Sequence, residues 1–96
     1  PVQVALLPLA DRHVDACKAL AAKITAAGGR VEVYTQNEPM RVKIAKAQAE
    51  KIPYMGVIGD KELEQGGVSI RERHEGDLGV WSEDKLLEVI REAALK

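Results

Sequence analysis

The sequence predicts one α/β domain whose sheet is largely parallel and ends in an antiparallel edge. Two observations predict this fold. Short apolar runs alternate with segments of helical periodicity, as in βαβ units, and two strand-like segments then follow one another without a helix between them. The length of 96 residues suits one domain, and a hydrophobic content of 46% is enough for a core.

The first third of the chain predicts a strand, a helix and a strand. Residues 2–9 form an apolar run that indicates a buried strand. Asp11 is expected to cap the helix that follows, and Gly28 with Gly29 to end it. The apolar residues of that helix recur at helical spacing: Val14, Cys17, Leu20, Ala21 and Ile24. Residues 31–34 predict the second strand.

The middle of the chain predicts a second helix and a third strand. The order Asn37-Glu38-Pro39 is typical of a helix start, so a helix is expected over residues 39–51. Its apolar side is formed by Met40, Ile44 and Ala47. A third strand is expected over residues 54–58, and residues 59–62 (Gly-Asp-Lys-Glu) then predict a charged turn.

The last third predicts two strands and a helix. In residues 68–73 apolar and polar side chains alternate, which indicates a strand whose wet face carries Ser69, Arg71 and Arg73. Residues 76–81 predict a shorter strand, and Ser82 is expected to cap the last helix. The apolar stripe of that helix comprises Leu86, Leu87, Ile90, Ala93 and Ala94. The resulting order, β-α-β-α-β-β-β-α, gives five strands and three helices, with helices on both faces of the sheet.

Charge and motifs restrict the function classes. The net charge is -1, so affinity for RNA must come from a local patch, from base contacts or from another domain. The sequence contains no phosphate-loop, dinucleotide-binding or nucleophile-elbow pattern, so no catalytic residue is expected. His13 and His74 are expected to be exposed and lack a metal-ligand spacing, and no metal site is expected.

The cysteine content and the hydropathy of the chain indicate the compartment in which the protein is expected. Cys17 is the single cysteine, so no internal disulfide can form, and it is expected to be a small buried hydrophobe. This usage fits a reducing cytoplasm. No apolar stretch is long enough to span a membrane. A start at Pro1 without Met suggests either a domain excised from a longer chain or a processed chain.

Three features could carry function. They are Asn37-Glu38 at a helix start, residues 59–62 after a central strand, and the strand face with Arg71 and Arg73. Each has a structural explanation by itself: capping, an ordinary turn and a solvated edge. Loops beyond strand ends are also where open α/β sheets bind ligands. Together the three features supply donors and acceptors that suit the recognition of unpaired bases.

Several motifs carry a family resemblance. Residues 52–55 (Ile-Pro-Tyr-Met), 59–62 (Gly-Asp-Lys-Glu), 68–71 (Val-Ser-Ile-Arg) and 77–79 (Asp-Leu-Gly) resemble the anticodon-binding domain of class II aminoacyl-tRNA synthetases. The threonyl type is the most similar, and the prolyl, histidyl and glycyl enzymes share the fold. The resemblance covers nearly the whole chain. It implies a three-layer, five-stranded mixed sheet flanked by three helices, at the C-terminus of a homodimeric cytoplasmic ligase.

The resemblance also implies partners and cofactors. The single domain, residues 1–96, would grip the anticodon loop of tRNA(Thr) and would have no cofactor of its own. Threonine would be attached to this tRNA by a separate catalytic domain that uses ATP, magnesium and zinc. The anticodon-binding domain would therefore not be an enzyme by itself.

Three residues match the family's anticodon contacts: Asn37, Glu62 and Arg71. Threonine anticodons end in G and U. Glu62 can accept hydrogen bonds from the N1-H and N2-H groups of guanine, and Arg71 can donate to its O6 and N7. The pair would span both edges of one unstacked base.

The second helix departs from the family pattern. Pro39, Arg41 and Ala45 stand where the family usually has Lys, Gly and Arg. Two family cations are missing and one new cation is present. We expect Arg41, Lys43 and Lys46 to supply the phosphate contacts instead.

Two other function classes remain open from the sequence. A protein-docking or dimerisation module of the same fold is favoured by the net charge of -1, although docking does not need Asn37, Glu62 and Arg71. A small-ligand domain is disfavoured by the missing phosphate loop. A positive groove bounded by Arg41, Lys43 and Arg71 would favour RNA, and an apolar patch there would favour docking.

Overall fold

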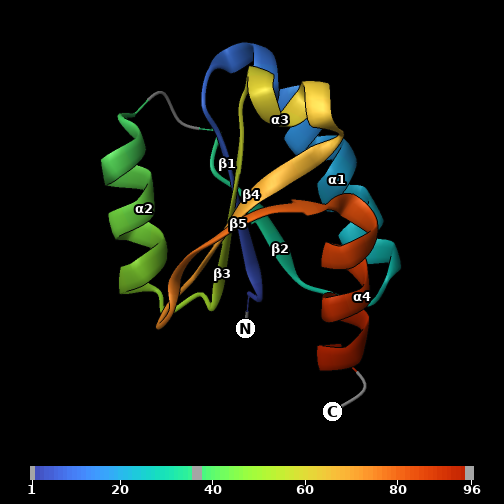
Figure 1. Ribbon diagram of the computed structural model, residues 1–96. Helices are drawn as coiled ribbons and strands as arrows, with labels where there is room; N and C mark the ends of the chain where they lie inside the picture. The colour runs from blue at the N-terminus through green and yellow to red at the C-terminus, as the bar shows by residue number, and fades with distance from the viewer. Residues whose placement is uncertain (1, 36–37, 95–96) are drawn as a thin grey trace.

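A five-stranded mixed sheet organises the computed structural model, which describes residues 2–35 and 38–94 (Figure 1). The strands lie in the order β2-β1-β3-β4-β5. Their bounds are β1 Val4–Pro8, β2 Val31–Val33, β3 Tyr54–Ile58, β4 Gly67–Glu72 and β5 Gly76–Ser82. Strand β1 pairs in parallel with β2 and β3, whereas β3-β4 and β4-β5 are antiparallel. The predicted mixed sheet with an antiparallel edge is confirmed.

Helices cover both faces of the sheet, as the alternation of strands and helices predicts. Helices α1 and α4 pack on one face and α2 on the other, while α3 lies at the end of the sheet (Figure 1). The bounds are η1 (a 3-10 turn) Asp11–His13, α1 Val14–Ala26, α2 Met40–Ala49, α3 Asp60–Gln65 and α4 Glu83–Ala94. The result is a three-layer α/β structure.

Two aliphatic cores lie on opposite faces of the sheet, and β1 contributes to both because successive side chains of a strand alternate. Val4 and Leu6 point toward α1 and α4, and Ala5 and Leu7 point toward α2. All four are fully buried, as expected for a central parallel strand. The first core is completed by Cys17, Leu20, Ile24, Ile58, Val68, Ile70, Leu86 and Ile90. The second contains Tyr34, Ala47, Ile52 and Met55.

The start of α1 differs from the prediction. Asp11 is not the cap of α1, because it begins the η1 turn that precedes this helix. The side chain that serves this turn is His13, whose Nδ1 accepts a hydrogen bond from the Ala10 N–H at 3.0 Å. The expected exposure of His13 is also wrong, since the side chain is 1% exposed. The ring can be buried because both of its nitrogens have a partner: the Ala10 N–H at Nδ1 and Asp60 Oδ1 at Nε2.

Residues 59–62 also differ from the prediction, because they open a helix instead of forming a turn. The Gly59 N–H donates to Glu62 Oε1 at 2.8 Å, which is the capping arrangement of an acidic residue at the third helical position. Helix α3 ends at Gly66, which adopts a left-handed φ of 67°. The three expected helices flank the sheet as α1, α2 and α4, and α3 is an additional short helix at its end.

The remaining helix ends agree with the sequence where they are described. Ser82 caps α4, since its Oγ accepts from the Lys85 N–H at 3.1 Å. Gly28 follows α1 with a φ of 92°, as a glycine after a helix does. For α2 the capping position is Pro39, without a side-chain cap. The expected capping role of Asn37 lies outside the described residues.

Burial of Cys17 leads to a prediction about its reactivity. The thiol is fully buried, and this burial raises its pKa to about 11. At about pH 8 the thiolate fraction is therefore on the order of one in a thousand. We expect no measurable labelling by a thiol reagent in the native protein and complete labelling in denaturant, measured by mass spectrometry. Equal labelling rates in the two conditions would contradict the buried position.

Candidate nucleic-acid interface

The α2 face of the sheet changes from apolar to polar across the strands. Two rows of paired residues cross it in register: Ala5–Met55–Arg71–Asp77 and Leu7–Val57–Ser69–Val80. On β1 and β3 these residues pack with α2. On β4 and β5 the face is open, and Val80 is 46% exposed. The polar half of the face is thus the half that no helix covers.

A hollow of ≈ 190 Å³ lies at the boundary between the part of the face that α2 covers and the open, polar half. It is lined by Leu7, Ile44, Met55, Val57, Ser69, Ile70, Arg71 and Asp77. Its floor is aliphatic and its rim is polar. A planar base could rest on such a floor while its edges meet the rim, which is the usual arrangement for unstacked bases.

Arg71 stands on this rim without a partner. Within residues 2–35 and 38–94, its guanidinium forms no hydrogen bond or ion pair. Asp77 is opposite Arg71 in register, but its Oδ1 accepts from the Gly79 N–H at 2.8 Å. A bulge at this point of the β4-β5 pairing, with Gly79 at a φ of 84°, brings Asp77 into that position. The five donors of Arg71 are available to a ligand.

Glu62 reaches the same strand from α3. Its Oε1 accepts from the Gly59 N–H, and its Oε2 accepts from Ser69 Oγ at 3.1 Å. Ser69 is two residues before Arg71 on the same face of β4, so the two positions are about 7 Å apart along the strand. Each carboxylate oxygen retains acceptor capacity. Ser69 thus holds Glu62 and also lines the hollow beside Arg71, whereas Glu62 itself is not among the residues that line this hollow. The sequence does not indicate this role of Ser69.

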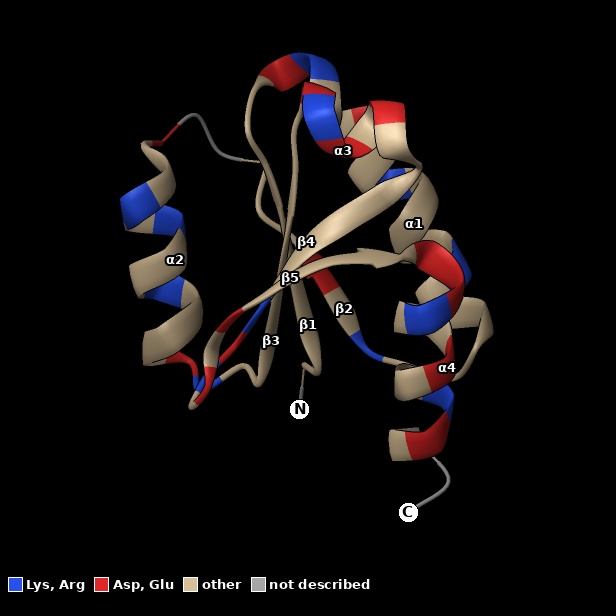
Figure 2. Cartoon of the chain, viewed as in Figure 1, with Lys and Arg blue, Asp and Glu red and all other residues tan. Residues whose placement is uncertain are grey.

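The three cations of α2 lie in different surroundings. Helix α2 carries no acidic residue (Figure 2). Arg41 is exposed and, within the described residues, its side chain forms no ion pair. Lys46 Nζ lies 2.6 Å from Glu38 Oε1. Lys43 is 7% exposed and donates to the Pro8 carbonyl at 3.3 Å.

The burial of Lys43 has a signal in the sequence. Position 43 is three residues after Met40 and four before Ala47, which places it on the packed side of the helix. Of the three cations expected to bound a positive groove, Arg71 lines the ≈ 190 Å³ hollow, Arg41 is exposed but is not among the residues that line it, and Lys43 is buried. Asn37 belongs to the segment that the structure does not describe.

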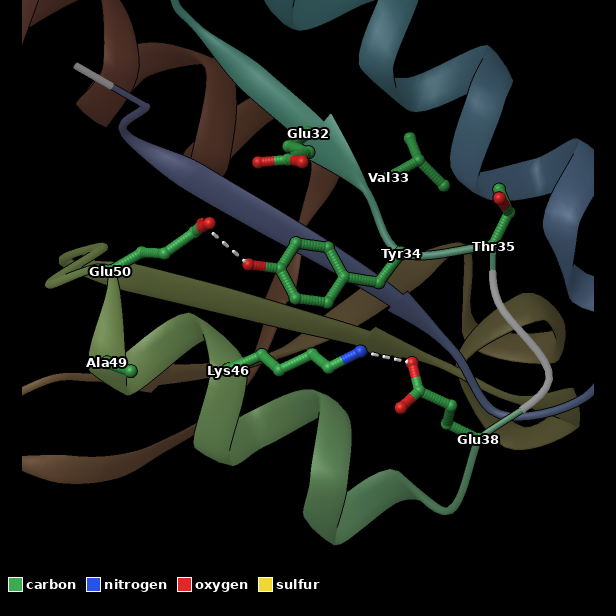
Figure 3. A pocket seen from close by; sticks show the side chains of 8 residues that line it. All are labelled: Glu32, Val33, Tyr34, Thr35, Glu38, Lys46, Ala49 and Glu50. Carbon is green, nitrogen blue, oxygen red and sulfur yellow. Dashed lines mark hydrogen bonds and ion pairs between the residues drawn. The ribbon is translucent and has the colours of Figure 1, made fainter.

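A second hollow, of ≈ 440 Å³, lies between β2 and α2 and has a different character (Figure 3). Three carboxylates line it: Glu32, Glu38 and Glu50. Tyr34 donates its hydroxyl hydrogen to Glu50 at 3.0 Å, and burial together with this carboxylate raises the pKa of Tyr34. Its one lysine, Lys46, is paired with Glu38. Negative charge of this density repels phosphate, so the smaller hollow beside Arg71 is the better candidate for an RNA contact.

A charged cluster holds the start of α3 against η1. Arg12 Nε and His13 Nε2 both lie within hydrogen-bond distance of Asp60 Oδ1, at 3.0 and 2.7 Å. These bonds hold the pKa of Asp60 well below its usual range, and the bond to Arg12 has the larger effect. Asp60 and Arg12 are largely exposed, so solvent screens their attraction.

Comparison with known proteins identifies the family. The model of the family described as "Anticodon binding domain" matches residues 3–93. The chain belongs to the anticodon-binding domain family. Among the curated relatives of this anticodon-binding domain, the threonine–tRNA ligase of Desulforamulus reducens is 49% identical over 82 residues, which are 85% of the chain and 13% of the relative. That of Caldanaerobacter subterraneus subsp. tengcongensis is 41% identical over 97 residues, 100% of the chain and 15% of the relative.

Two solved tRNA synthetase structures share the fold. The RNA-binding domain of threonyl-tRNA synthetase from Cryptosporidium parvum Iowa II superposes with a TM-score of 0.89 at 22% identity, over 96% of the chain and 23% of that structure. Histidyl-tRNA synthetase from Nostoc sp. PCC 7120 gives 0.87 at 19% identity, over 97% and 22%. The chain spans only about one seventh of the curated relatives it matches.

The described residues show neither a metal cluster nor a membrane span. Among residues 2–35 and 38–94, no group of three or more His, Cys, Asp or Glu side chains is arranged to hold a metal ion. In the same part of the chain, no helix has both the length and the apolar character that crossing a bilayer requires.

The lowered pKa of Asp60 leads to a prediction about stability at acidic pH. The folded pKa lies below the ordinary value of 3.8, so the stabilisation is present above that pH and is lost as the pH falls. In Asp60→Asn we expect the melting temperature to fall less steeply than in the unaltered protein between about pH 4 and pH 2. Circular dichroism measures both curves. Asp15→Asn, which removes an exposed carboxylate of α1, is the matched control, and parallel curves for Asp60→Asn and the unaltered protein would contradict the prediction.

Proposed function

We propose that the chain recognises the anticodon loop of tRNA(Thr) as the C-terminal domain of a threonine–tRNA ligase. The observation that carries this proposal is the placement of Arg71. Its unpartnered guanidinium, among the residues that the structure describes, stands on the rim of an aliphatic hollow, and the Glu62 carboxylate is held on the same strand face. Family membership and the threonine–tRNA ligases among the relatives support the choice of RNA and of tRNA(Thr).

The readout would use the two sides of one base. A guanine lying on the aliphatic floor would direct O6 and N7 to Arg71, which is the bidentate match for these acceptors. Its N1-H and N2-H groups would meet the free lone pairs of Glu62. Asn37 remains a proposed contact for a neighbouring anticodon base. The polar half of the sheet face would thus read sequence, and cations around it would hold the backbone.

Phosphate contacts would come mainly from Arg41. It is the cation of α2 that is exposed and forms no ion pair among the described residues. Lys46 would have to leave Glu38, and the buried Lys43 would have to move toward the surface, so their contributions would be smaller.

The rest of the enzyme would supply the chemistry. Attachment of threonine to tRNA would take place in another domain of a longer, homodimeric, cytoplasmic protein that uses ATP, magnesium and zinc. The relatives are several times longer than this chain, so there is room for such a domain. Residues 1–96 would then form the anticodon-binding domain alone, without cofactor.

Base discrimination tests the proposal. We expect tighter binding to a stem-loop with a threonine anticodon ending in GU than to one in which this G is replaced by A, at low salt. Arg71→Ala should remove roughly 1–3 kcal/mol of that preference. Arg91→Ala, which removes an exposed arginine of α4 on the opposite face of the sheet, is the matched control.

The outcomes of this titration separate the function classes. Equal binding of both loops by the unaltered protein would leave a non-specific electrostatic patch and reject anticodon readout. No binding of either loop would favour the docking module, for which the exposed face of β4 and β5 would be the interface.

Salt dependence tests the phosphate contacts. We expect Arg41→Ala to weaken binding of both loops equally and to reduce the slope of log K against log salt by about 0.7, the value for one phosphate of a single strand. Lys18→Ala, on α1 at the opposite face, should leave the slope unchanged. An unchanged slope in Arg41→Ala would show that this residue contacts no phosphate.

A further inference from the structure

Two loops at one end of the sheet are joined by three side chains, which we call the Asp60 cluster: Arg12, His13 and Asp60. Arg12 donates to both carboxylate oxygens of Asp60, through Nε at 3.0 Å and through Nη2. His13 Nε2 lies 2.7 Å from Asp60 Oδ1. The Leu9 N–H also donates to the Ile58 carbonyl at 3.0 Å, so backbone and side chains join the same two segments.

The protonation of His13 follows from its partners. Nδ1 accepts from the Ala10 N–H and therefore carries no proton. In the neutral ring the proton is on Nε2, which donates to Asp60. With the ring 1% exposed, both of its nitrogens need a partner within the protein, and in this orientation Ala10 and Asp60 supply them. The position of Asp60 is thus fixed by a buried group, although Asp60 itself is exposed.

The first turn of α3 carries both Asp60 and Glu62. Glu62 bonds to the Gly59 N–H and to Ser69 Oγ. The junction is closely packed, since a Cβ on Gly59 would lie 2.9 Å from Leu9 Cδ2 and 3.0 Å from Glu62 Oε1. A helix of six residues is too short to be stable alone, so its first turn depends on such external bonds.

We propose that Asp60 is a positioning residue for Glu62. It holds the first turn of α3 against η1, and thereby sets where the Glu62 carboxylate meets the base beside Arg71. The inference rests on the proposed anticodon readout and adds a residue to it that does not itself touch RNA. A purely structural Asp60 would stabilise the fold without acting through Glu62, and this difference can be measured.

A double-mutant cycle makes the test. The preference for the G-containing over the A-containing stem-loop is measured for Asp60→Ala, for Glu62→Ala and for the double variant. All titrations run well below each variant's melting temperature. We expect Asp60→Ala to reduce the preference about 2- to 10-fold in the presence of Glu62 and to have no further effect in Glu62→Ala. In the Glu62→Ala variant, Arg71 is expected to maintain a measurable preference for the G-containing stem-loop, so that a further effect of Asp60→Ala could be detected.

Two controls separate positioning from stability and charge. Asp60→Asn keeps an oxygen that can accept from His13 Nε2–H, so it should retain more of the preference than Asp60→Ala and remains available where the alanine variant fails to fold. Lys23→Ala breaks an exposed ion pair between α1 and α4 and should leave the preference unchanged. The Gly59 amide proton, observed by NMR, should shift in Asp60→Ala without RNA, because its bond to Glu62 is displaced.

The outcomes distinguish the inference from the function on which it rests. If Glu62→Ala lowers the preference and Asp60→Ala does not, the positioning role is overturned and the readout stands. An Asp60→Ala effect of equal size in both backgrounds would also overturn it, since Asp60 would act independently of Glu62. If neither Glu62→Ala nor Arg71→Ala alters the preference, the proposed readout itself fails.

Discussion

The unequal cover of the two sheet faces is the constraint on which the rest of the structure depends. Helices α1 and α4 bury one face, whereas the single helix α2 has to cover the other. One helix is about 10 Å wide and neighbouring strands are nearly 5 Å apart, so it covers about two strands. The side chains under α2 are aliphatic. Those on β4 and β5 are more polar, because water and ligands reach them.

This constraint explains how a chain with a net charge of -1 can present the surface that we propose to bind RNA. The net charge of -1 is an average over the molecule. Three carboxylates gather in the hollow between β2 and α2, while Arg71 and Arg41 lie without ion pairs in the part of the chain that the structure describes. The local field near the hollow beside Arg71 therefore differs from what the net charge suggests. The net charge taken alone therefore favours a protein-docking module over RNA binding more strongly than this local surface does.

Most of the fold can be predicted from the sequence because its signals are local. The strands and long helices have periodic apolar residues, and helix ends are marked by residues such as Gly28 and Ser82. Helix α3 escapes prediction because six residues are too few to show periodicity, and its one signal is the spacing of Gly59 and Glu62. The burial of His13 escapes it because its partner Asp60 is 47 residues away, and no local pattern reveals such a pair.

In the candidate site too, features with a local sequence signal can be predicted, whereas contacts between distant segments cannot. Arg71 on an open strand face follows from alternation, and its exposure is as predicted. The bond between Ser69 and Glu62 joins two elements across a turn and cannot be inferred from either alone. The prediction that Lys43 is a surface cation rests on its charge. Its spacing from Met40 and Ala47 places it on the packed side of α2, where the structure has it. Asn37 stays a prediction, since it lies outside the described residues.

The bulge in the β4-β5 pairing has a consequence for the outer edge of the sheet. Strand β5 is the last strand, and such an edge presents unpaired backbone groups to which another chain can add a strand. Gly76 and Gly79 of β5 both have a positive φ. The register of β5 against β4 also shifts, since Ile70 pairs with Gly79 but Arg71 pairs with Asp77. A sixth strand could not follow this interrupted edge over its whole length. The irregularity that places Asp77 beside the hollow thus also makes the β5 edge a poor template for edge-to-edge pairing.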